Sequence, residues 1–338
     1  MRRGAGFCGE AAKTKPAQQS SPAPLISLHV NVCSFLVRVR FFSLPRLYLS
    51  RRYDIIKKKC EDMSMEIIKM HGLGNDFILA DNRTGDIKNE NELAAALCKR
   101  RLSVGADGLI TIEPSDVADI RMRIFNSDGS EAEMCGNGIR CFARLVYDQK
   151  IVKGEEFSVE TLAGIMRPKI ALDDAGNVSG VRVDMGLPDF TPENIPMTAK
   201  NSLETRITAA GSELSVHCCL MGVPHCVVIV DGGEVSEEDF DRLGPAIESH
   251  EIFPKKINVN FARIIDRKNV AVRTWERGAG PTLACGTGSC ATVCVLSEMG
   301  LIDKCADIHL AAGVLHIEYG KTVYMTGAAE YVFKGELI

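Results

Sequence analysis

The stretch MCGNGIRCFARLVYDQ (134–149) decides the fold. Ile139 and Phe142 recur there at helical spacing, and the segment NSDGS (126–130) just before it is rich in turn-forming residues. A helix is therefore predicted to begin directly after Cys135.

A second stretch, ACGTGSCATVCVL (284–296), repeats this plan 150 residues later. The sequences CGNG (135–138) and CGTG (285–288) both stand between a polar turn and a helical pattern. Self-similarity of this kind predicts two like-folded halves, each of which contributes one cysteine at a helix start.

The rest of the body alternates short apolar segments with helical patterns, so its class is predicted to be mixed α/β. Helices are expected at 91–101 and 239–250. Strands are expected at 66–70, 77–80, 108–112, 120–125, within 159–183, at 222–231, 259–265 and 270–275.

Composition excludes several classes of protein. The chain has 338 residues with 25% charged and 46% hydrophobic residues, which is typical of a globular protein of two domains. A net charge of -4 argues against a general nucleic-acid binder. The 13 cysteines include no C-x-x-C pair and fit no small disulfide framework, so most of them, Cys141, Cys290 and Cys294 among them, are expected in the core. The segment HGLGNDF (71–77) lacks the third glycine of a dinucleotide-binding loop.

The first 60 residues differ from the body because they hold 12 lysines and arginines against two acidic residues. Three interpretations stay open: an organelle transit segment, an unstructured arm, or upstream sequence translated from a start codon placed too early. The apolar stretch 25–49 contains Arg38, Arg40 and Arg46, so no membrane span is predicted. We expect a cytoplasmic protein, or one of the plastid stroma if the head is a transit peptide.

The two CGxG motifs suit proton removal next to a carboxylate. Backbone N–H groups at a helix start are unpaired, the helix dipole favours negative charge, and glycine lets a carboxylate approach closely. The dipole is also expected to lower the pKa of Cys135 and Cys285. One thiolate and one thiol on opposite faces of a carbon can invert its configuration. His225 and Glu276 are candidate auxiliaries for thiol deprotonation.

These motifs give the chain a specific resemblance to the diaminopimelate epimerases. It covers residues 65–338 and leaves the head outside. The segments that carry it are KMHGLGNDF (69–77), GADGLI (105–110), FNSDGSEAEMCGNGIRCFAR (125–144), PHC (224–226), INVNF (257–261) and ERGAGPTLACGTGSCA (276–291).

The resemblance implies two pseudosymmetric domains, each a barrel-like, mostly antiparallel sheet around a central helix, with the active site in the cleft between them. The expected parts are a basic extension at 1–64, a first half at 65–182 plus 325–338, and a second half at 183–324. It further implies a small amino-acid substrate, a possible homodimer, and no metal, pyridoxal phosphate or nucleotide.

The resemblance also assigns the site. Cys135 and Cys285 become the acid/base pair. The reacting carboxylate is expected on Gly136, Asn137, Gly286 and Thr287, with Asn75 in support, and the distal end of the substrate on Asn126, Asn258, Glu276 and Arg277.

One position departs from the family pattern. Val223 stands in GVPHC (222–226) where many members have asparagine, which would donate a hydrogen bond to the distal end of the substrate. A racemase of proline, hydroxyproline or histidine is therefore the alternative function. A non-enzymatic relative of the same fold is a third class, against which the retention of both cysteines argues.

Overall fold

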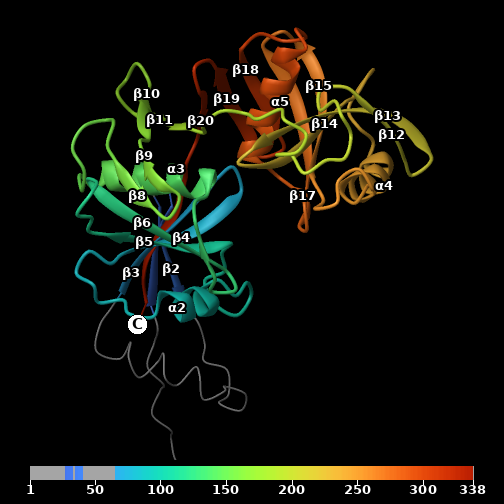
Figure 1. Cartoon of the computed structure of the whole chain (residues 1–338). Coiled ribbons are helices and arrows are strands. Elements are labelled where there is room, and N and C mark those ends of the chain that lie inside the picture. Colours follow the sequence, from blue (N-terminus) through green and yellow to red (C-terminus); the bar gives the residue numbers. More distant parts are fainter. Residues whose placement is uncertain (1–26, 33–34, 41–64, 338) are drawn as a thin grey trace, which may run out of the picture.

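The computed structural model describes residues 27–32, 35–40 and 65–337. Figure 1 shows two lobes, with helix α3 (Gly136–Asp148) in one and α5 (Gly286–Glu298) in the other. Most of the basic head lies outside the described residues, so the structure does not test its three interpretations. The described part of the head forms an antiparallel pair of strands, β1 (Ser27–Val32) and β2 (Phe35–Arg40).

The first half is built on a sheet with the strand order β21-β3-β4-β5-β6-β8-β9, and β7 pairs with β6. The last strand of the chain returns to this half, because β21 pairs antiparallel with β3. The strands are β3 (Met65–Gly72), β4 (Asn75–Asp81), β5 (Gly108–Glu113), β6 (Ile120–Asn126), β7 (Glu131–Ala132), β8 (Val159–Thr161), β9 (Gly164–Met166) and β21 (Glu330–Leu337).

The second half is built on a sheet with the order β10-β11-β20-β19-β18-β16-β15-β14-β13-β12, and β17 pairs with β16. Its strands are β10 (Lys169–Leu172), β11 (Val178–Asp184), β12 (Thr205–Ala209), β13 (Ser212–Met221), β14 (Val223–Ile229), β15 (Asn258–Asp266), β16 (Asn269–Glu276), β17 (Gly280–Thr282), β18 (Cys305–Leu310), β19 (Gly313–Tyr319) and β20 (Val323–Gly327).

The two halves repeat one pattern of connections. In each half a strand pairs in parallel with the next one, β4 with β5 and β14 with β15, across a helix, α2 (Glu90–Leu97) or α4 (Glu237–Glu248). An antiparallel hairpin and the central helix α3 or α5 follow. The mixed α/β class with two sheets is confirmed. Within residues 65–337 both strand orders run as open paths from one edge to the other.

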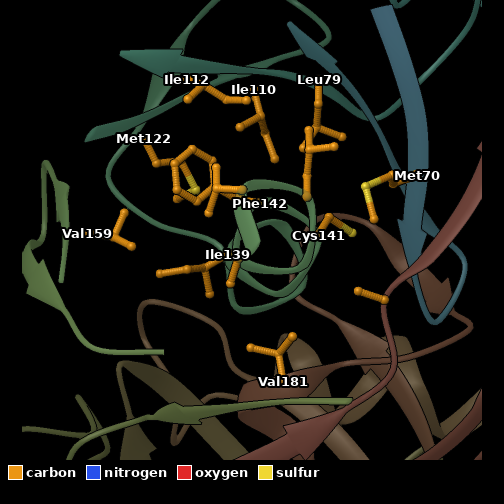
Figure 2. Packing of buried hydrophobic residues seen from close by; sticks show 14 of the residues in the cluster. Met70, Leu79, Ile110, Ile112, Met122, Ile139, Cys141, Phe142, Val159 and Val181 are labelled. Carbon is orange, nitrogen blue, oxygen red and sulfur yellow. The ribbon is translucent and has the colours of Figure 1, made fainter. Parts of the chain in front are cut away.

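Each sheet buries one face against its central helix. In the first half the side chains of Ile139, Cys141 and Phe142 on α3 enter a cluster with residues of β3 to β6, and Val181 of β11 closes it from the other side (Figure 2). The predicted boundary at residues 182 and 183 thus falls inside β11, which packs against α3 while it pairs with β20. Burial of each such side chain contributes about 1.5–3 kcal/mol to stability.

The outer faces of the sheets carry smaller clusters against α2 and α4. The helix predicted over 91–101 ends earlier than expected, at Leu97, and Arg101 takes the left-handed conformation with φ 69°. The helix predicted over 239–250 begins at Glu237, because Ser236 caps it by accepting from the backbone N–H of Asp239. None of the helices described between residues 65 and 337 is long and apolar enough to cross a membrane.

Candidate active site

The two cysteines of the repeated motif occupy the same local structure. Cys135 precedes α3 and Cys285 precedes α5, both in extended backbone with φ -142° and -127°. Their carbonyls accept the first helical hydrogen bonds, from Ile139 and Ser289, at 2.9 Å each. The prediction that each half places one cysteine at a helix start is confirmed, and the first N–H groups of each helix have no partner within it.

Both helix starts open into one cleft of about 620 Å³. The first half contributes Leu73, Gly74, Asn75, Arg100, Asp107, Met134, Cys135, Gly136 and Asn137 to its lining, and the second half contributes Val223, Glu276, Pro281, Thr282, Leu283, Ala284, Cys285, Gly286 and Thr287. Within the described part of the chain, no group of three or more His, Cys, Asp or Glu side chains is arranged to hold a metal ion.

The side chain of Met325 lies between the two helix starts. A Cβ added at Gly136 would lie 3.2 Å from its methyl carbon, and one added at Gly286 would lie 3.0 Å from its sulfur. These glycines therefore leave room for a side chain that holds the first turns of α3 and α5 close to each other.

Burial has the largest effect on the pKa values of the two thiols. It raises the pKa of Cys135, while the backbone N–H groups of Asn137 and Gly138 act in the opposite direction. Burial raises the pKa of Cys285 to about 12, and the charge of Glu276 adds to the rise. The prediction of lowered thiol pKa values is wrong, because desolvation destabilises the thiolate more than the helix N-terminus stabilises it.

The first-half cysteine belongs to a chain of amides. The Cys135 sulfur donates to Asn75 Oδ1 at 3.6 Å, and Asn137 Nδ2 donates to the same oxygen at 3.1 Å. Asn75 Nδ2 in turn donates to Asp107 Oδ2 at 2.7 Å. Asp107 was not singled out from the sequence, although GADGLI (105–110) is one of the family segments.

The second-half cysteine has a hydroxyl and a carboxylate near it. Its sulfur lies 3.6 Å from Thr287 Oγ1. The carboxylate of Glu276 is close enough to help raise the pKa of the Cys285 thiol. Thr282 Oγ1 donates to Glu276 Oε1 at 2.9 Å and so fixes the carboxylate at the end of β16. The two thiols thus have different polar partners.

His225 does not line the cleft. Its ring is fully buried, and burial together with the charge of Arg277 lowers its pKa to about 3, so it is neutral. Asn260 Nδ2 lies 3.2 Å from His225 Nδ1, while Thr274 donates to Asn260 Oδ1. Nδ1 is therefore the acceptor and Nε2 carries the proton, without a partner among the described residues.

Three further predicted residues lie outside the cleft lining. Asn258 is buried, donates to the Pro224 carbonyl at 2.9 Å and accepts from the backbone N–H of Arg277 at 2.9 Å. Within residues 65–337 the Arg277 guanidinium donates to the Lys255 carbonyl alone, at 3.2 Å. Asn126 ends β6 and donates to Ser130 Oγ at 3.0 Å. The predicted carboxylate-binding residues thus line the cleft, and of the predicted distal group Glu276 lines it too, while Arg277 and Asn258 lie next to Glu276.

Comparisons with known proteins show the family of this chain. The family model for diaminopimelate epimerase matches residues 67–191 and 217–332. A diaminopimelate epimerase of Desulfitobacterium hafniense is 49% identical over 281 residues, which are 81% of this chain and 98% of the relative. One of Moorella thermoacetica is 48% identical over 278 residues, 80% of this chain and 99% of the relative.

Solved structures share the fold at low sequence identity. A PhzF-family phenazine biosynthesis protein of Bacillus anthracis superposes with a TM-score of 0.59 at 17% identity, covering 82% of this chain and 99% of that one. A probable proline racemase of Agrobacterium radiobacter gives 0.57 at 16% identity, covering 81% and 93%. Taken with the sequence matches, which cover nearly the whole length of the relatives, these findings show that the chain is an isomerase and belongs to the diaminopimelate epimerase family.

Proposed function

We infer that this chain interconverts LL- and meso-2,6-diaminopimelate by moving the α-proton between the thiols of Cys135 and Cys285. The observation that carries this proposal is the single cleft into which both cysteines open, each from the N-terminal end of the central helix of its own half. Two bases that come from different halves can approach one carbon from opposite faces.

The reaction needs a site for negative charge. When a base removes the α-proton, the electron pair moves onto the neighbouring carboxylate, which becomes enolate-like. The unpaired N–H groups at the starts of α3 and α5, around Gly136, Asn137, Gly286 and Thr287, supply that stabilisation. They do the work that a pyridine ring does in cofactor-dependent racemases, so the proposal needs no pyridoxal phosphate, metal or nucleotide.

The proton balance is simple. The thiolate of one cysteine takes the α-proton and becomes a thiol. The thiol of the other cysteine gives its proton to the opposite face of the carbon and becomes a thiolate. The protein ends with the two roles exchanged, and the same steps run in reverse for the other stereoisomer.

One thiol must lose its proton before turnover, since burial raises the pKa of both. The Glu276 carboxylate, which lines the same cleft as Cys285 and acts on the pKa of its thiol, is the group assigned to receive that proton. No proton transfer is assigned to His225, whose ring supports Asn260 within the second half.

The distal amino-acid end of the substrate is assigned to Arg277 and Glu276, with Asn258 and Asn126 in support. The Arg277 guanidinium donates one hydrogen bond to a backbone carbonyl and pairs with no carboxylate of the described residues, so it can bind a substrate carboxylate through two parallel hydrogen bonds. Asn258 holds the Arg277 backbone in place.

The test is conversion of LL-diaminopimelate to the meso form by freshly reduced protein. We expect the unmodified chain to be active and Cys135→Ala and Cys285→Ala each to lose at least about 100-fold in kcat. Cys305→Ala is the matched control, because Cys305 is exposed and outside the cleft, and it should keep full activity. Racemisation of proline, hydroxyproline or histidine without turnover of diaminopimelate would contradict the proposal and favour the alternative function.

A further inference from the structure

The guanidinium of Arg140 is fully buried one turn after Cys135 on α3. Among the described residues its hydrogen bonds go to neutral acceptors: the carbonyl of Gly136 at 3.0 Å, Oδ1 of Asn137 at 2.9 Å, the carbonyl of Ala328 at 3.2 Å and the sulfur of Met325 at 3.9 Å. Among the residues that the structure describes, no carboxylate lies within ion-pair distance of it. A buried arginine without a counter-charge is costly, and it keeps its proton in proteins.

Two glycines make room for this side chain. A Cβ added at Gly72 would lie 3.0 Å from Nη2 of Arg140, and one added at Gly327 would lie 2.4 Å from the side chain of Leu315 and 3.2 Å from Nε of Arg140. The Arg140 side chain therefore lies between the end of β3, in the first half, and the end of β20. Because larger residues at these positions would collide with the guanidinium, its burial is built into the surrounding strands.

Arg140 also starts a chain of hydrogen bonds that runs in one direction. It donates to Asn137, whose amide nitrogen donates to Asn75, whose amide nitrogen donates to Asp107. Arginine can only donate and an ionised carboxylate can only accept, so the two ends fix the orientation of both amides. The chain therefore presents Asn75 Oδ1 to the sulfur of Cys135.

Arg144, on the next turn of the same helix, makes a useful contrast. It donates to the Ala329 carbonyl at 2.6 Å, just as Arg140 donates to Ala328. It differs in having an acidic partner, Asp148, at 3.4 Å. A hydrogen bond from α3 to the segment that joins β20 and β21 thus needs no unpaired charge, and the missing counter-charge of Arg140 calls for another explanation.

We propose that Arg140 is a positioning residue whose buried positive charge is compensated by the anions of the working site, the substrate carboxylate on the first turn of α3 and the thiolate of Cys135. This inference rests on the proposed function. The charge draws an anion toward the helix start, and the planar fork holds Gly136 and Asn137 in the position that receives it.

Other ionisable groups near Arg140 also affect how readily the Cys135 thiol ionises. The thiols of Cys141 and Cys290 lie near Arg140, and its charge favours ionisation of Cys135. The charge of Glu276, from the second half, acts against that ionisation. Asp107, at the far end of the amide chain, carries a negative charge that Arg100 pairs at 2.7 Å.

Two substitutions of Arg140 distinguish the effect of its positive charge from that of its planar, forked guanidinium. The rate of iodoacetamide alkylation of Cys135, followed by mass spectrometry of its peptide across a pH series, reports thiolate formation without turnover. Arg140→Met removes the charge. The pH at which alkylation of Cys135 is half-maximal should then rise by about one unit, so at a fixed pH below it the alkylation rate should be about tenfold lower. In Arg140→Lys the charge stays and the fork is lost, so the midpoint should stay near that of the unmodified chain while KM for diaminopimelate rises about tenfold.

Arg144→Met is the control and should change neither quantity. An unchanged midpoint in Arg140→Met, or an equal rise in Arg144→Met, would overturn the proposal. If Arg140→Met does not fold, Arg140→Lys decides alone: a KM within twofold of the unmodified chain, or a raised alkylation midpoint, would also overturn it. Failure of the proposed function looks different, since no variant and not even the unmodified chain would then convert diaminopimelate.

Discussion

Asn75 and Val223 occupy equivalent positions in the two halves, as the first residues of β4 and β14, which each pair in parallel with the next strand. Both side chains line the cleft. Asn75 brings an amide that contacts Cys135, whereas Val223 brings an apolar side chain that is 37% exposed. The cleft is therefore symmetric in its helices and asymmetric in the polar groups around them.

Val223→Asn should restore a donor to the second side of this cleft. One added hydrogen bond to the substrate is worth about 1 kcal/mol, so KM for diaminopimelate should fall about fivefold with little change in kcat. Initial-rate kinetics will show this, with Val223→Ala as the control that removes bulk without adding a donor. A higher KM in the asparagine variant would show that Val223 is adapted to the substrate as it stands.

Arg277→Ala should weaken binding of the distal carboxylate. A hydrogen bond between charged groups contributes about 1.5–3 kcal/mol, so KM should rise about 10-fold to 100-fold while kcat changes less. Arg267→Ala is the matched control, since Arg267 is an exposed arginine paired with Asp303. Unchanged KM in the Arg277 variant would remove its assigned role.

Alkaline pH should destabilise the fold through its buried thiols. Burial raises the pKa of Cys141 to about 12 and that of Cys285 to about 12, against an ordinary value of 9.0. Their stabilising contribution is complete below about pH 9 and is lost as the pH rises toward 12, because the unfolded chain ionises first.

Each such thiol contributes a loss of about 1.4 kcal/mol per pH unit in that range. Urea unfolding in reducing buffer should therefore give a lower midpoint at pH 10 than at pH 8. Cys141→Ala should show a smaller drop between the two pH values. Equal midpoints for the unmodified chain would contradict the burial of ionisable thiols.

Gly244→Ala should lower stability even though alanine is the better helix former. A Cβ at this position of α4 would lie 2.6 Å from the Trp275 ring, and such overpacking costs about 1–3 kcal/mol. Gly233→Ala is the control, because no atom lies within 4 Å of its added Cβ. Urea unfolding of both variants checks this, and a stabilised Gly244 variant would show that the ring moves freely.

Much of the fold could be predicted from the sequence, because the informative patterns are local. Apolar spacing placed α3 and α5, and the repeated CGxG motif showed that the two halves are alike. The early end of α2 at Leu97 was missed, since the turn that stops it involves Gly105, whose N–H donates to the Leu97 carbonyl. Single-sequence spacing does not show such a contact.

The site was predictable where the motif itself forms it, and less so where burial decides. The helix N-terminus was expected to lower the thiol pKa values, and only the packed structure shows that desolvation outweighs it. Arg140 belongs to the CGNGIRC motif (135–141), but its lack of a counter-charge among the described residues depends on every element that surrounds it. For the same reason the sequence could not show that His225 is buried away from the cleft.

The central claim is that two thiols act on opposite faces of one carbon. Its most direct test is a short incubation of LL-diaminopimelate with the reduced protein in deuterated water, analysed before equilibrium is approached. The account predicts that the meso product carries deuterium at the inverted carbon while the unreacted LL substrate carries none. A meso product that retains the original hydrogen at that carbon would mean that one base returns the proton it removed, and would contradict the account.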